Sequence, residues 1–138
     1  MTLVSRAVHA AFLNTGSPHH VEWLDSASAL DTLDLAQAAL TARHHSDYSP
    51  GGCNVSVVAK EGECLHIRTF ERGVEAETLS CGTGVVAAAL ADMAREDASA
   101  GRHVRHVFAR GGGLEVEATR QAGGTFQAVS YTHLTLPT

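Results

Sequence analysis

Cys81 is the residue best placed to do chemistry, because Gly82, Thr83 and Gly84 follow it directly. The glycines allow a tight backbone turn, and the first amides of a helix starting here have no carbonyl partner within that helix. Such amides favour an anion, so they lower the pKa of a neighbouring thiol and can hold a substrate carboxylate. The pattern predicts a reactive thiol at an anion-binding helix start; the alternative is a packed free cysteine whose glycines serve only helix entry.

An acidic and a basic residue, Glu71 and Arg72, lie a short distance upstream at the end of an alternating run. A carboxylate and a guanidinium at such a strand end could face the same substrate as Cys81. They could instead form an exposed pair that contributes little. Asn54 also has two interpretations: it could contact the substrate, or it could be only a turn residue, as asparagines before strands often are.

Strands and one buried helix are expected to position these residues. A strand, a tight loop and a second strand are predicted over residues 12–24, and Asp31–Arg43 has the 3.6-residue repeat of an amphipathic helix, with Leu40 on its apolar face. Further elements follow from alternation or from small apolar residues: strands over 54–59, 65–70, 104–108 and 114–118, a possible strand from Phe126, and a buried helix over 85–95. This order predicts an α+β fold with a mostly antiparallel or mixed sheet.

The composition excludes several classes of protein. The 138 residues include 10 basic and 15 acidic side chains, a net charge of −5, which argues against binding to nucleic acid or anionic lipid. The longest strictly apolar run, Val85 to Ala91, is far shorter than the roughly 20 residues of a membrane helix, and the first residues lack a signal-peptide core. We therefore expect a soluble, cytoplasmic protein.

The cysteines, the lysine and the histidines bear on cofactors. Cys53, Cys64 and Cys81 are odd in number and show no C-x-x-C spacing, so reduced thiols are expected, and Cys53 and Cys64 are predicted to be buried. Lys60 is the only lysine and is expected at a solvated strand end, which argues against pyridoxal phosphate. The paired histidines lack a further ligand at a diagnostic spacing, so we predict no metal site. These pairs are His19-His20, His44-His45 and His103 with His106.

Three segments, in order, resemble the C-terminal motifs of the diaminopimelate epimerase family. They are Asn14–His19, Asn54–Val55, and Glu71–Val74 with Glu77–Gly84. The resemblance implies an enzyme of lysine biosynthesis that interconverts LL- and meso-2,6-diaminopimelate without a cofactor. It also implies two similar lobes, each a barrel-like mixed or antiparallel sheet wrapped around a central buried helix. One thiolate removes the α-proton, and a thiol from the opposite lobe returns one to the other face.

The resemblance also implies residue roles. Cys81 is the acid or base of this lobe, and Gly82 and Thr83 hold the α-carboxylate. Glu71 and Arg72 contact the substrate, and His19 and Glu71 support the catalytic groups. Asn54 binds the distal amino-acid head, and Ser17 contacts the substrate where many members carry asparagine.

The sequence departs from the family at both ends. Nothing before Asn14 resembles the cysteine motif of the N-terminal lobe, so residues 1–128 are expected to form a C-terminal lobe that is inactive alone, and residues 129–138 resemble a cloning remnant. The expected partners are the amino-acid substrate, the missing lobe and, for the full-length enzyme, a second copy. The alternatives are another isomerase of this fold, proline racemase-like or phenazine-biosynthesis-like, and a non-catalytic carboxylate-binding module.

Overall fold

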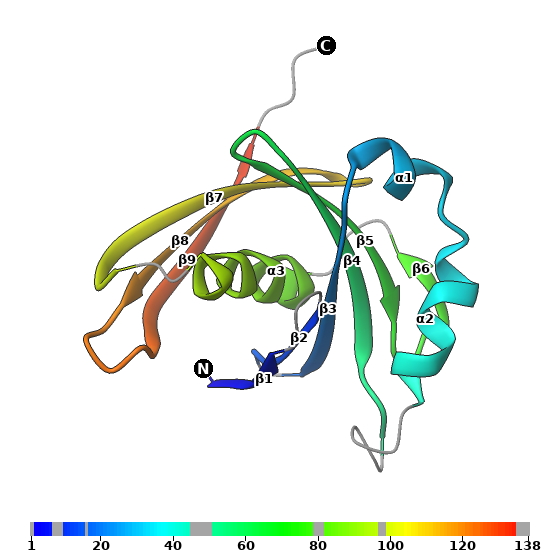
Figure 1. The fold of residues 1–138 in the computed structure, drawn as a ribbon, viewed down its shortest axis with the longest axis horizontal. Helices are drawn as coiled ribbons and strands as arrows, with labels where there is room; N and C mark the ends of the chain where they lie inside the picture. Colours follow the sequence, from blue (N-terminus) through cyan, green and yellow to red (C-terminus); the bar gives the residue numbers. More distant parts are fainter. Residues whose placement is uncertain are drawn as a thin grey trace.

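The computed structural model describes residues 2–6, 10–15, 17–44, 51–78, 82–96 and 99–134. In these residues a curled sheet wraps around one helix, and two shorter helices lie on its outside (Figure 1). The helices are α1 (Ala27–Thr32), α2 (Leu35–Arg43) and α3 (Gly82–Arg95). The strands are β1 (Thr2–Arg6), β2 (Ala10–Asn14), β3 (Pro18–Leu24), β4 (Asn54–Glu61), β5 (Cys64–Glu71), β6 (Ala76–Thr78), β7 (Gly101–Ala109), β8 (Gly112–Arg120) and β9 (Phe126–Leu134).

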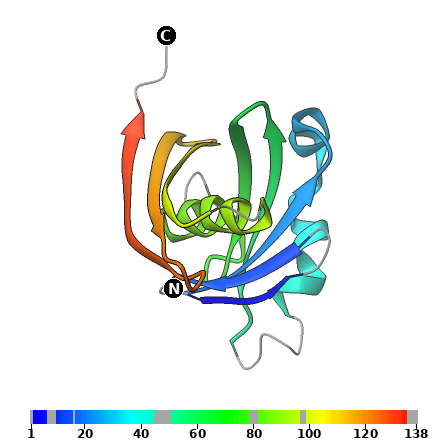
Figure 2. The same ribbon diagram turned by 60° about the vertical axis from the view of Figure 1, so that its left-hand side comes forward.

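The described strands form one nine-stranded mixed sheet. Its order is β1-β2-β3-β4-β5-β7-β8-β9, and β6 pairs with β5 outside this path. The pairs β3–β4 and β5–β7 are parallel, whereas the other pairs are antiparallel. Seen from the side, the sheet curls around α3 (Figure 2). The predicted α+β class, with a barrel-like mixed sheet around a central buried helix, is confirmed.

Helix α3 fills the inside of the curl because its side chains are small and apolar on almost every side. Ten of its 14 residues are buried, and half of those are alanine. A helix that is apolar all round must lie inside the protein. The predicted buried helix is therefore confirmed, and it begins at Gly82, three residues before the apolar run.

Strand β4 is buried on both faces, although its sequence alternates. Val58 belongs to the core cluster around α3, whereas Val55 and Val57 pack with residues of α1 and α2 on the outer face. The pattern alone predicts a half-buried strand. The strand is instead buried on both faces, because α1 and α2 cover the face of the sheet that points away from α3.

The region 31–43 corrects the prediction of one continuous helix. The structure has two helices, and Asp34 caps the second by accepting a hydrogen bond from the amide of Gln37 at 3.2 Å. Arg68 of β5 donates to the carbonyl oxygens of Leu30 and Leu33, each at 2.7 Å, and so stabilises the end of α1. Leu40, expected on the apolar face, is 52% exposed.

The structure also has strands that the sequence patterns miss or predict to be shorter. Strands β1 and β6 are not predicted from the sequence, since neither has a long alternating run. β9 continues to Leu134, farther than the short pattern from Phe126 indicates. Where the native chain ends stays a prediction. No helix within the described ranges is long and apolar enough to cross a membrane.

We predict that Arg68→Met lowers the free energy of unfolding by about 3 kcal/mol, because one buried guanidinium serves three acceptor groups. Besides the two carbonyls of α1, it binds both carboxylate oxygens of Glu77, at 2.8 and 2.9 Å. Urea unfolding followed by circular dichroism measures the loss. Arg102→Met is the matched control, because it breaks an exposed pair with Glu117 and should change stability little. Equal losses in the two variants would contradict the assignment.

Candidate active site

The candidate site lies where the ends of three strands meet the start of α3. Parallel β3 and β4 place His19 opposite Asn54. β5 runs antiparallel to β4, with Phe70 opposite Val55, so β5 ends beside the start of β4. The topology thus brings together residues from all three motifs that the sequence singles out.

Thr83 in the first turn of α3 joins the helix to the start of β3. Its hydroxyl lies 3.1 Å from Nε2 of His19 and 3.3 Å from the hydroxyl of Ser17. The Ser17 hydroxyl is itself 3.0 Å from the same imidazole nitrogen. Thr15 donates from its hydroxyl to the backbone carbonyl of Thr83 at 3.1 Å. These contacts fix the start of α3 against the loop between β2 and β3.

His19 is a buried, neutral imidazole. It has no exposed surface, and burial lowers its pKa from 6.5 to about 4, with a smaller contribution from the positive charge of Arg72. Its Nδ1 has no hydrogen-bond partner within the described part of the chain. At neutral pH, the His19 ring is therefore uncharged, and its Nε2 forms hydrogen bonds with the hydroxyl groups of Ser17 and Thr83.

Asn54 holds the turn that follows β5. Its side-chain oxygen accepts a hydrogen bond from the backbone amide of Arg72 at 2.7 Å, and its amide nitrogen donates to Ser17 and to the carbonyl of Pro18 at 3.4 and 3.3 Å. Both ends of this 5% exposed side chain are thus used within the site. The structure gives Asn54 a scaffolding role; its predicted contact with substrate stays a prediction.

Gly52 allows the close approach of Arg43 beside the turn that carries Arg72. Its φ is +72°, and a Cβ there would lie 2.2 Å from both the carbonyl oxygen and a guanidinium nitrogen of Arg43, so only glycine fits. Its carbonyl accepts a hydrogen bond from the Arg72 guanidinium at 3.4 Å. Arg43 in turn binds the Gly51 carbonyl at 3.1 Å and the carboxylate of Glu75 at 2.6 Å.

Three further residues were predicted to belong to the site, and the structure treats each of them differently. Gly82 is the first residue of α3, as expected for a helix start. Glu71 is half-buried at the end of β5, and among the described residues its carboxylate makes no hydrogen bond. Cys81 lies outside the described residues, so its predicted catalytic role stays a prediction.

The other two cysteines differ from each other. Cys53 is fully buried and its thiol donates to the carbonyl of Ala42 at 3.3 Å, while burial raises its pKa to about 11. Cys64, expected to be buried, is only half-buried because it lies at the start of β5. In the described ranges, no group of three or more histidine, cysteine or acidic side chains is arranged to hold a metal ion.

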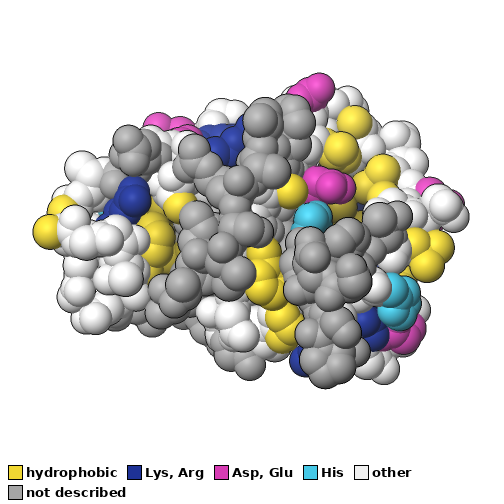
Figure 3. Space-filling view, turned by 60° about the horizontal axis from the view of Figure 1, so that its bottom comes forward, with side chains coloured by type: hydrophobic (Ala, Val, Ile, Leu, Met, Phe, Trp, Pro, Cys, Tyr) yellow, Lys and Arg dark blue, Asp and Glu magenta, His cyan; other side chains and the backbone are white. Residues whose placement is uncertain are grey.

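The described site is suited to an anion. Its polar groups are hydroxyls, a carboxamide, a neutral imidazole and the Arg72 guanidinium, and they lie near the first turn of α3, where helix amides favour an anion. The face seen from below Figure 1 shows patches of hydrophobic side chains, with an acidic and a histidine side chain close to one of them (Figure 3). A carboxylate is therefore the ligand group that the described residues favour.

Two contributors were not predicted as site residues. Thr15 fixes the helix start, and Gly52 shapes the turn around Arg72. Thr15 lies inside the first motif, which was a usable signal. The role of Gly52 depends on its contact with Arg43, and no local sequence pattern indicates that these two residues meet.

His19 makes stability depend on pH. Because its folded pKa of about 4 lies below 6.5, the unfolded chain binds the extra proton between these values, so the free energy of unfolding falls as the pH drops from about 6.5 to 4. The full effect is about 3 kcal/mol. His19→Leu should flatten this part of the profile in urea unfolding, whereas His106→Gln, on the surface, should retain it. A profile for His19→Leu as steep as that of the native chain would refute this.

Known proteins match most of this chain in sequence. The family profile described as diaminopimelate epimerase matches residues 11–133. The diaminopimelate epimerase of Flavobacterium psychrophilum is 40% identical over 111 residues, covering 80% of this chain and 41% of the relative. That of Methanothrix thermoacetophila is 47% identical over 104 residues, covering 75% of this chain and 34% of the relative. The chain thus spans less than half the length of these curated relatives.

Solved structures share the fold. A phenazine biosynthesis protein of the PhzF family from Bacillus anthracis has a TM-score of 0.54 at 20% identity, with 86% of this chain and 37% of that chain covered. A protein described as a predicted epimerase from Pseudomonas aeruginosa has a TM-score of 0.54 at 14% identity, with 80% and 36% covered. At these identities the likeness concerns the fold alone. The profile match over most of the sequence shows that the chain belongs to the diaminopimelate epimerase family.

Proposed function

We propose that this chain forms one lobe of a cofactor-independent epimerase that interconverts LL- and meso-2,6-diaminopimelate, and that Cys81 is one of its two acid/base groups. The observation that carries the proposal is the meeting of Ser17, His19, Asn54 and Arg72 at the start of α3. Residue 81 directly precedes that helix. The family membership supplies the substrate class.

The reaction needs an acid and a base on opposite faces of one carbon. A thiolate on one face removes the α-proton, so the C–H bond breaks as an S–H bond forms and the electron pair stays on the substrate. A thiol on the opposite face then delivers its proton to the carbon, and the centre is inverted. A thiol near the positive end of a helix is suited to either part because its pKa is lowered toward neutrality.

The described residues supply the groups that hold the substrate. Gly82 and Thr83 present helix-start amides and a hydroxyl to an α-carboxylate, which would also stabilise charge that develops next to the reacting carbon. Arg72 adds a positive charge at the end of β5. Neutral His19 keeps the Thr83 hydroxyl oriented without competing for the anion.

The opposite thiol must come from another part of the enzyme. The relatives are more than twice as long as the region that this chain matches. A catalytic thiol also requires a reducing compartment, so we place the enzyme in the cytoplasm.

A hybrid enzyme tests the proposal. The chain is joined to the part of the Flavobacterium psychrophilum diaminopimelate epimerase that it does not match. In D2O the hybrid should convert LL- into meso-diaminopimelate with deuterium at the α-carbon, while the 138-residue chain alone should be inactive. Cys81→Ala should reduce turnover by about 10³-fold, the usual contribution of an acid/base group. Chiral chromatography with mass spectrometry measures both products.

Cys64→Ala is the matched control, because this half-buried thiol lies outside the site. The control should leave turnover unchanged. Turnover by the isolated chain, or a folded hybrid that is equally active with alanine at position 81, would contradict the proposal.

Alkylation of the isolated chain gives an independent test. With iodoacetamide near pH 7.5, Cys81 should react about tenfold faster than a free cysteine peptide, because a helix start favours its thiolate. Cys53 should react more slowly than the peptide, since burial raises its pKa to about 11. Site-resolved mass spectrometry measures the rates. If Cys81 is no faster than the peptide, the site is better described as a carboxylate-binding module.

A further inference from the structure

Helix α3 has few side chains that could stop it from sliding or turning within the sheet. Its contacts with the sheet come largely from Gly84, alanines and a few larger apolar residues. Small apolar side chains pack closely, but they give little directional restraint. The polar contacts of the helix, which require a defined geometry, therefore add to the restraint that packing gives to its position along its axis.

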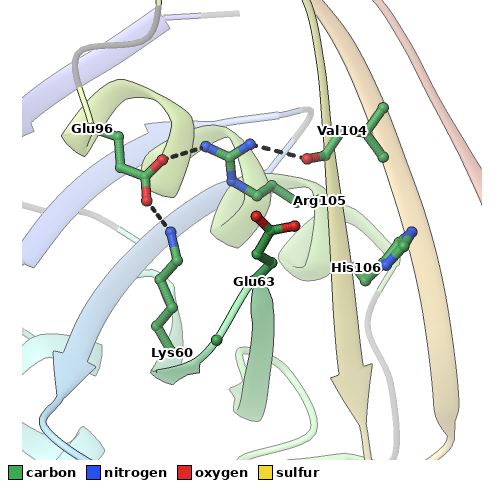
Figure 4. Close-up of a pocket in the computed structure, with 7 residues that line it drawn as sticks. Lys60, Glu63, Glu96, Val104, Arg105 and His106 are labelled. Carbon is green, nitrogen blue, oxygen red and sulfur yellow. Dashed lines mark hydrogen bonds and ion pairs between the residues drawn. The ribbon is translucent and has the colours of Figure 1, made fainter.

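Asp92 is the charged residue that α3 buries. It is 2% exposed, and its Oδ2 accepts hydrogen bonds from Lys60 at 3.0 Å and from Arg105 at 2.8 Å. Glu96, one turn later, binds the same two cations, with Arg105 at 2.8 Å (Figure 4). These four residues form a closed set of ion pairs, which we call the α3 clamp.

The clamp connects α3 to two strands. Lys60 lies near the end of β4 and Arg105 in β7, on either side of β5 in the sheet. Lys60 is thus part of a structural ion-pair network rather than a freely solvated strand end. A displacement of α3 along its axis or around it would separate Asp92 from at least one cation and leave a buried charge uncompensated.

Open space on both sides of the clamp increases its importance. A cavity of about 580 Å³ lies beside Lys60, Glu96 and Arg105, and is drawn in Figure 4. A second cavity of about 360 Å³ is lined by Trp23, Asp92 and Glu96. Both spaces open to solvent around the charged side chains, so the ion pairs supply part of the restraint on this end of the helix.

Further contacts of α3 include the Arg95 guanidinium, 4.5 Å from the centre of the Trp23 ring at the same end of the helix, and Thr83 at its start, which meets His19 and Ser17. Thr83 and Asp92 are nine residues apart, which corresponds to about 14 Å along a rigid helix. We propose that Asp92 is a positioning residue: through the clamp it sets the depth and rotation of α3, and thereby the place of Thr83 relative to His19 and Ser17. Its relevance to catalysis rests on the proposed function, but its structural effect does not.

The test changes Asp92 near the end of α3 and measures the effect at Thr83 and His19, at the start of the helix, in the isolated chain. In Asp92→Asn, which keeps the side-chain shape, the Thr83 contact should loosen and admit water to His19. The pKa of His19, followed by NMR of its ring, should then rise by at least one unit from about 4. The backbone amide signal of Thr83 should shift as well. Neither readout requires epimerase activity, so this test stands if the proposed function fails.

Glu117→Gln is the control, because it removes a surface ion pair with Arg102 without touching α3. It should leave both readouts unchanged. If Asp92→Asn does not fold, Glu96→Gln replaces it, since this exposed member of the clamp should move both readouts in the same direction by a smaller amount. A folded variant that loses stability but keeps the native His19 pKa and Thr83 signal would overturn the proposal.

Discussion

The contact between Thr83 and the pair Ser17 and His19 is the interaction on which the site depends. It joins the start of the central helix to the start of β3, across 64 residues of sequence between His19 and Thr83. Without this contact, the first amides of α3 would lose a direct link to the strand ends that carry the other site residues. With it, the anion-favouring end of α3 faces the turn that carries Arg72.

Burial of His19 has a cost and a consequence. Enclosing an imidazole whose Nδ1 lacks a partner among the described residues disfavours its charged form, which lowers its pKa to about 4. The same burial keeps the ring neutral over the physiological range. The residues that we propose to hold an anion thus share a site with a histidine that does not add positive charge, and Arg72 is the positively charged residue among them.

Local sequence patterns were enough to predict the elements that carry the site. The alternation of β5 and the small residues of α3 are local signals, and three ordered motifs indicated which residues would meet. The break at Asp34 was not predictable, because it depends on Arg68, which is 35 residues away from Leu33. The scaffolding use of Asn54 was missed for the same reason, since its partner Arg72 is 18 residues further along.

The central claim is that the start of α3 binds a substrate carboxylate. Its most direct test is an NMR titration of the chain with meso-diaminopimelate and, separately, with cadaverine, which has the same amines but no carboxylates. The account predicts that diaminopimelate shifts the amide signals of Gly82 and Thr83 and that cadaverine does not. Equal shifts with both compounds, or shifts confined to residues far from the start of α3, would contradict it.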